Sequence, residues 1–170
     1  MSMADESAFL TSRIRTLQII VAALVMGVLM ALITFCSLRA LGNVPPAPPT
    51  PMVSYVAVAF AVMIVMPFAI VPPLLVTTAR KRLAQYGEGH DTLVSSLFMT
   101  YQTKTIIGCA LLEGVAFFQA IAYFLEGQQI SLILASAFMA GIAVHFPTRT
   151  RLERWIERQT ELIEQEKAVG

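Results

Sequence analysis

Glu113 is the residue whose type and position most clearly suggest chemistry in this chain. It lies within an apolar run from Ile106 to Leu125, between the polar residues Lys104 and Glu126. A helix over this run would be about 31 Å long, which is enough to cross a lipid bilayer. A charge near the middle of a bilayer costs at least about 3 kcal/mol, so such residues are rare and often functional. Glu113 is therefore a candidate proton- or cation-binding group. The alternative is a protonated carboxyl that forms a structural hydrogen bond.

The sequence provides no cationic partner for Glu113. No Lys or Arg lies at a matching depth in another apolar run, so we expect the carboxyl to be mostly protonated at neutral pH. The face of Glu113 is rich in small residues, and Ala110 and Gly114 add a small-xxx-small step, so a second helix can approach it closely. The small residues of this face are Cys109, Ala110, Ala116 and Ala120. Gln119 and Ser136 are expected to lie at the same depth in the membrane, nearer its outer side than Glu113. There they are expected to form a supporting hydrogen bond between helices.

The composition of the chain predicts the structural elements that position these residues. The chain has 170 residues, of which 56% are hydrophobic and 14% are charged, and its mean hydropathy is +0.70. These values predict an all-α, polytopic membrane protein. A cytoplasmic arm (1–15) precedes a transmembrane domain (16–146) with four spans, at about 16–41, 52–79, 104–125 and 130–146. No cleavage site follows the first apolar run, so we expect it to be retained.

Connections between the spans have distinct compositions. Residues 44–51 are rich in proline and predict a stiff, extended link. The second span contains three prolines, at 67, 72 and 73, which would kink a helix. Residues 79–104 contain a turn at Gly87–Gly89 between two runs that are compatible with helix. We expect these runs to form a helical hairpin that protrudes into the cytoplasm.

The last segment, residues 147–170, predicts a cytoplasmic amphipathic helix. Thr150 and Glu153 have capping-box spacing, which places the helix at about 151–168. Ion pairs are expected between Arg149 and Glu153 and between Arg158 and Glu161. Its apolar strip could lie on the membrane surface or pair with a neighbouring copy of the chain; the strip consists of Leu152, Trp155, Ile156, Leu162 and Ile163.

Basic residues predict the orientation in the membrane. Of the 12 Lys and Arg residues, all but Arg39 lie in the N-terminal arm, the 79–104 segment or the C-terminal tail. By the positive-inside rule, both termini and the 79–104 hairpin are cytoplasmic, and a bacterial inner membrane is the simplest location.

The first and third spans also align without gaps. Ile19-Ile20, Ala23-Leu24 and Gly27-Val28 match Ile106-Ile107, Ala110-Leu111 and Gly114-Val115, with Met26 in the place of Glu113. A parallel duplication of a two-span hairpin would give this pattern, and so would chance similarity between apolar helices.

The run from Ile106 to Phe118 reads Ile-Ile-x-x-Ala-Leu-x-Glu-Gly-Val-Ala-x-Phe. Residues 105–125 resemble the carboxylate-bearing second helix of the c subunit (proteolipid) of rotary, F-type ATP synthases. In that family the glutamate carries the translocated proton or sodium ion. The resemblance implies that Glu113 is an ion-binding acid in a membrane oligomer.

No motif for catalysis, for metal binding or for a cofactor is present, so we expect a protein that is not an enzyme and has no cofactor. No basic soluble surface suggests nucleic-acid binding. Two hypotheses remain. The chain is either a c-subunit-like, proton- or sodium-binding protein or a structural or assembly subunit of a membrane complex. Its expected partners are the lipid bilayer and either further copies of itself or other membrane proteins.

Overall fold

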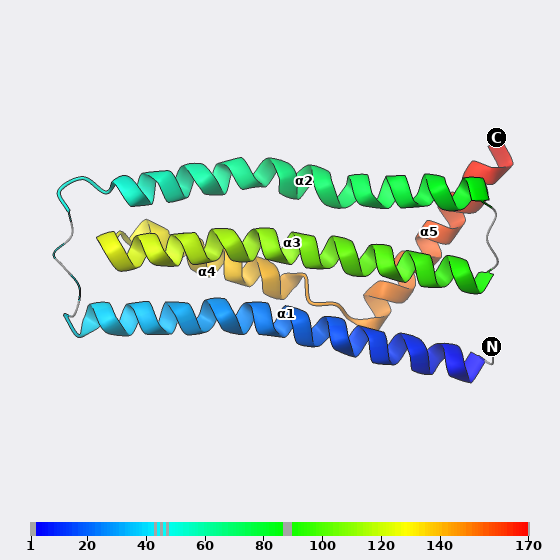
Figure 1. The fold of residues 1–170 in the computed structure, drawn as a ribbon, viewed down its shortest axis with the longest axis horizontal. Helices are drawn as coiled ribbons and strands as arrows, with labels where there is room; N and C mark the ends of the chain where they lie inside the picture. Colours follow the sequence, from blue (N-terminus) through cyan, green and yellow to red (C-terminus); the bar gives the residue numbers. More distant parts are fainter. Residues whose placement is uncertain (1–2, 43, 45, 47, 87–89, 170) are drawn as a thin grey trace. The chain divides into compact units, whose positions relative to one another are not determined.

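The computed structural model describes residues 3–42, 44, 46, 48–86 and 90–169, with side chains for 11–42, 44, 46, 48–85 and 92–168. This part of the chain is all-α, as predicted, and contains five helices and no strand. Figure 1 shows them in chain order: α1 (Met3–Ala40), α2 (Met52–Tyr86), α3 (His90–Glu126), α4 (Gln129–Val144) and α5 (Arg149–Val169).

The helices α1, α2 and α3 are longer than the spans expected from hydropathy alone. α2 continues to Tyr86 and α3 begins at His90, so the prediction that both runs flanking the turn are helical is confirmed. The turn itself, residues 87–89, lies outside the described residues. α2 also passes through Pro67, Pro72 and Pro73 without a break in helical structure.

Three helices are long and apolar enough to cross a membrane. They are α1 over Thr11–Ala40, α2 over Met52–Gln85 and α3 over Thr92–Glu126. α4 has 16 residues, about 24 Å of helix, and is short for a hydrocarbon core about 30 Å thick. A fourth span is counted only if α4 and α5 are taken together. The expected span at 130–146 is therefore not established by α4 alone.

The chain forms two compact units, and we name each by its composition. The apolar unit comprises Val21–Phe68 and Gly108–Phe146, and the basic unit comprises Met1–Ile20, Ala69–Ile107 and Pro147–Gly170. Only three charged residues, Arg39, Glu113 and Glu126, belong to the apolar unit. Glu113 and its surroundings are therefore described within the apolar unit.

The core of the apolar unit joins α1, α3 and α4. α1 contributes Val21, Val28 and Leu32 at helical spacing, and α3 and α4 add a row of small residues that includes Cys109, Ala116, Ala120 and Ala135. Four of these small side chains are 0% exposed: Cys109, Ala116, Ala120 and Ala135. The prediction that small residues of α3 permit close helix packing is therefore confirmed for these α3 positions. Cys109 is a packing residue of this core.

In the basic unit, the apolar strip of α5 packs on helices of the same chain. Leu152 joins a cluster with Ile14 and Leu17 of α1 and with Phe98 and Tyr101 of α3. Ile163 joins a second cluster with Leu83, Leu93 and Leu97. These contacts bury Leu152 and Ile163 against helices of the same chain, whereas Trp155, Ile156 and Leu162 of the strip are half-buried.

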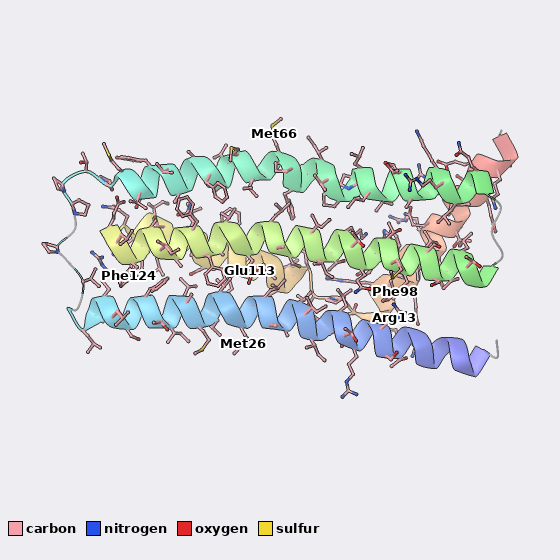
Figure 2. All side chains as sticks on the ribbon, viewed as in Figure 1. Arg13, Met26, Met66, Phe98, Glu113 and Phe124 are labelled. Carbon is pink, nitrogen blue, oxygen red and sulfur yellow. The ribbon has the colours of Figure 1, made fainter. Side chains whose placement is uncertain are left out.

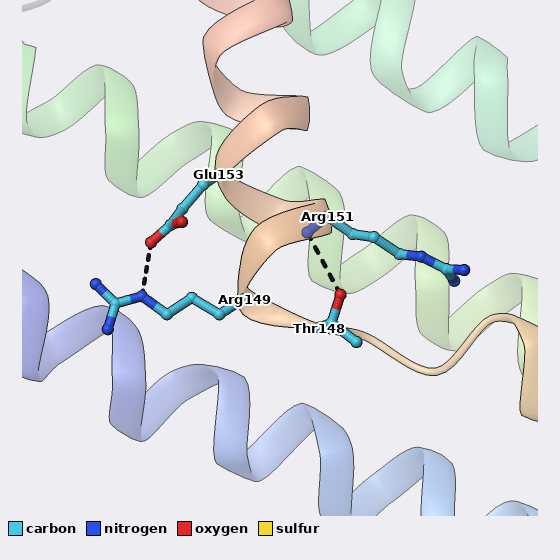
Figure 3. A network of polar contacts seen from close by, with 4 residues as sticks. All are labelled: Thr148, Arg149, Arg151 and Glu153. Atoms are coloured by element: carbon cyan, nitrogen blue, oxygen red, sulfur yellow. Dashed lines mark hydrogen bonds and ion pairs between the residues drawn. The ribbon is translucent and has the colours of Figure 1, made fainter.

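α5 begins two residues earlier than the sequence predicts. α5 begins at Arg149, and the Thr148 hydroxyl accepts a hydrogen bond from the N–H of Arg151 at 3.4 Å (Figure 3). Thr148 thus takes the capping position expected for Thr150, because the helix starts two residues earlier. Arg149 Nε and Glu153 Oε1 lie 2.6 Å apart, as predicted. Among the described residues, the expected Arg158–Glu161 ion pair is not formed.

Candidate functional site

Glu113 lies in the middle of α3, on the side that faces α1 in the apolar unit (Figure 2). α3 is continuous at this point although Gly114, a poor helix former, directly follows Glu113. Its side chain is half-buried, whereas Ala110 and Gly114 beside it are exposed. The carboxyl therefore lies at the seam between α1 and α3, at the edge of the packed core.

Gly27 of α1 makes room for this carboxyl. A methyl group built on Gly27 would lie 3.6 Å from Oε1 of Glu113 and 3.7 Å from Cζ of Phe117. These are ordinary van der Waals distances, so an alanine fits and a larger apolar side chain would press on the carboxyl. The Phe117 ring also lies against this position, and Gly27 itself offers no side chain there.

No partner neutralises Glu113 within the described residues. Its carboxyl forms no hydrogen bond or ion pair there, and no group of three or more His, Cys, Asp or Glu residues is found that could hold a metal ion. A buried or half-buried carboxylate without a partner is unfavourable in an apolar setting. Binding a proton is the chemistry that this arrangement can perform.

Ala110 and Gly114 do not pack closely against another helix in the described part of the chain. Both residues are exposed, and a methyl group on Gly114 would meet nothing within 4 Å. The expectation that a second helix packs on this step is therefore wrong for helices of the same chain. The packed face of α3 is the neighbouring row that contains Ala116 and Ala120.

The expected hydrogen bond between Gln119 and Ser136 is not formed in the structure. Gln119 is 0% exposed, and both polar atoms of its amide are without a partner. Ser136 is exposed and donates to the carbonyl of Leu132, one turn earlier in α4, at 2.9 Å. Ser136 satisfies its hydroxyl locally because a helical carbonyl four residues back is always within reach. Neither residue supports Glu113.

A second polar cluster, which sequence reasoning missed, joins the ends of helices in the apolar unit. Glu126, at the end of α3, is 3% exposed. Its two oxygens accept hydrogen bonds from the N–H groups of Val53 and Ser54 at 2.6 and 2.8 Å. These donors lie in the first turn of α2, where a helix has no internal acceptors and favours negative charge. The Ser131 hydroxyl lies 3.3 Å from that of Ser54 and extends the cluster to α4.

Arg39 makes the complementary interaction at the end of α3. Its Nη1 donates to the carbonyl oxygens of Phe124 at 2.9 Å and Tyr123 at 3.5 Å. Gly127 follows with a φ of +70°, and any side chain there would overlap the guanidinium. A glycine is therefore required both by the left-handed backbone and by the approach of Arg39. The charge of Arg39 satisfies carbonyls that the helix leaves free.

One signal in the sequence could have found this cluster. Glu126 stands at the carboxyl end of its own helix, where a negative charge is unfavourable, and α2 begins with no acidic residue in its first turn. An acid at the wrong end of one helix can serve the amino end of another.

The class of the protein follows from its fold: the part of the chain that the structure describes is all-α, with three helices long and apolar enough to cross a membrane. Helices of this length and composition support the assignment of the chain as a membrane protein. Comparison of the chain with models of protein families, with curated proteins and with solved structures finds no match.

Proposed function

We propose that this chain is a non-catalytic integral membrane protein in which Glu113 binds and releases a proton at the seam between α1 and α3. One observation carries the proposal. Of the three charged residues in the apolar unit, Arg39 and Glu126 are satisfied by helix ends, and Glu113 has no partner among the described residues. The resemblance of residues 105–125 to the ion-carrying helix of rotary ATP synthases supports the same role.

A proton suits this site better than a sodium ion. Hard cations require several oxygen ligands at short distance. Gly27 and the Phe117 ring, which meet at this position with the Glu113 carboxyl, bring no side-chain oxygen to it. The other acid of the apolar unit, Glu126, accepts hydrogen bonds from the N–H groups of Val53 and Ser54.

The composition of the two units supports a particular placement in the membrane. The basic unit contains every Lys and Arg residue except Arg39, and we place it on the cytoplasmic side of a bacterial inner membrane. It also includes the start of α1, the adjoining ends of α2 and α3, and all of α5. Since both termini belong to this unit, the chain must return to the same side after α3. This requirement supports a fourth crossing by the segment that contains α4.

Chemical modification with a hydrophobic carbodiimide tests the proposal. This reagent reacts with protonated carboxyls that are accessible from lipid, so Glu113 is expected to be modified at neutral pH in membranes. Glu126 is the matched internal control, because its carboxylate is buried and accepts two backbone hydrogen bonds. Peptide mapping by mass spectrometry distinguishes the two sites. Equal modification of both residues, or none of Glu113, would refute the proposal, and protection by sodium would favour a cation.

The second candidate is a structural or assembly subunit, and the exposure of α2 favours it. Only 6% of the most apolar 18-residue stretch of α2 is buried, so this surface is free to contact lipid, another copy or a partner protein. In this case Glu113 would be a neutral group without an ionic role. The substitution Glu113→Gln keeps the shape but cannot titrate, so wild-type behaviour of this variant in every assay would favour assembly. A closed ring in native-like membranes would favour the c-subunit-like role, and a monomer would count against it.

A further inference from the structure

A cleft between α2 and α3 in the basic unit has the composition of a site for an amphipathic anion. Its volume is about 550 Å³. Its α2 wall includes Leu75, Thr78 and Arg82, which lie on one face at helical spacing, and its α3 wall includes Ser96 and Thr103. α2 and α3 run antiparallel, so Arg82 and Ser96 are near the end of α2 at Tyr86 and the start of α3 at His90. Leu75 and Thr103 are at the opposite end.

The donors that line this cleft are free to bind a ligand. Within the described residues, Arg82, Thr78 and Ser96 have no side-chain hydrogen bond or ion pair. Thr103 differs, because its hydroxyl hydrogen is used by the carbonyl of Met99 at 2.9 Å. A guanidinium and two hydroxyls from two helices can therefore donate to one anionic group.

The described residues that line the cleft include a basic side chain, Arg82, and no acidic one. The neighbouring Arg80 is paired with Glu166 of α5 at 2.9 Å, so it does not compete for a ligand in the cleft. Arg82 is the cation of the cleft, and its guanidinium, which has no acidic partner among the described side chains, favours an anion.

We infer that the cleft binds the phosphate of an anionic phospholipid, with Arg82, Thr78 and Ser96 as donors and Leu75 against the first part of an acyl chain. A lipid is favoured over a free anion because both walls belong to helices apolar enough to cross a membrane, Met52–Gln85 and Thr92–Glu126. Arg82 lies near the end of the first of these, where basic residues meet lipid headgroups. This inference does not depend on proton binding by Glu113.

Native mass spectrometry of the full chain, released from detergent with added lipid, tests the assignment. The probes are phosphatidylglycerol and phosphatidylcholine of the same acyl composition, with inorganic phosphate as a third arm. Arg82→Gln should lower retention of phosphatidylglycerol at least about fivefold. Lys81→Gln is the matched control, since Lys81 is exposed, adjacent and outside the cleft. Thr78→Val, at an exposed position that a valine can occupy, should lower retention without affecting folding.

Each outcome decides the question. Preference for phosphatidylglycerol that is lost in Arg82→Gln and Thr78→Val and kept in Lys81→Gln supports the site. Equal losses in Arg82→Gln and Lys81→Gln would show a diffuse surface charge effect and overturn it. Phosphate that binds alone and displaces the lipid at equal concentration would show an anion site without lipid specificity. No preference between the two lipids in the wild type would also overturn the inference.

Discussion

Replacing Glu126 by alanine removes the acceptor for two backbone N–H groups at the start of α2. The donors, Val53 and Ser54, lie 2.6 and 2.8 Å from the carboxylate oxygens. The other two N–H groups of this turn already have acceptors, since Met52 donates to Thr50 and Tyr55 to Pro51. Ser54 is 3% exposed, so water has little access to its N–H once the carboxylate is gone.

The expected loss of stability follows from these two bonds. A hydrogen bond to a charged acceptor contributes about 1.5–3 kcal/mol, and a negative charge at a helix amino end contributes about 0.3–1 kcal/mol. Because one carboxylate serves both donors, the contributions do not add fully. We expect Glu126→Ala to lower the free energy of unfolding by about 2–4 kcal/mol. For a chain of this length, the unfolding temperature would fall by about 5–15 °C.

A thiol-reactive fluorophore can follow this unfolding, because Cys109 is 0% exposed in the core of the apolar unit. The measurement is made in a Cys36→Ser background, so that the half-buried Cys36 does not react first. Glu113→Gln is the matched control on the same helix, and its unfolding temperature should change little because Glu113 has no partner to lose. If Glu126→Ala unfolds at the temperature of the wild type, the capping role of Glu126 is wrong.

Three further predictions concern other parts of the chain. A cysteine at the exposed Thr50 should react with an impermeant reagent added outside intact cells, and reaction only in inverted vesicles would reverse the proposed orientation. Lys104→Met should change the fluorescence of Trp155 and cost about 0.5–2 kcal/mol, because Lys104 Nζ lies 4.2 Å from the centroid of that ring; an unchanged spectrum would contradict this contact. Gly27→Ser should bring a hydroxyl within reach of the Glu113 carboxyl and reduce its modification by carbodiimide, while Gly27→Ala should not. Equal effects of the two variants would indicate that bulk, rather than hydrogen bonding, is responsible.

The helices could be predicted from the sequence because apolar runs and turn residues determine them locally. Hydropathy located α1, α2 and α3, and the helical runs on either side of residues 87–89 were also predicted. The partner of α5 could not be predicted from the sequence. An amphipathic strip indicates that one face of a helix packs on something, but it does not identify the partner. Leu152 and Ile163 pack on other helices of the same chain, which depends on the tertiary fold.

The candidate site was predictable only in part, for a related reason. Glu113 is conspicuous because a single charge interrupts an apolar run. Gln119 and Ser136 share a depth, but depth does not fix the direction in which a side chain points around its helix. Ser136 therefore bonds within α4, and Gln119 is buried without it. The roles of Arg39 and Glu126 depend on which helix ends lie together, which no local pattern records.

The two glutamates of α3 differ because of what neighbouring helices can offer at each position. At a helix end, backbone N–H groups are free, and Glu126 takes two of them from α2. Within a helix those groups are already bonded to carbonyls four residues back, so α1 has no backbone donor to give Glu113 beside Gly27. Only a side chain, a water molecule or a proton can satisfy a carboxyl there, and the Phe117 ring and the absent side chain of Gly27 provide no donor. The same packing that leaves Glu113 without a protein partner therefore leaves a proton as the group that can neutralise it, and this makes reversible protonation the function most worth testing.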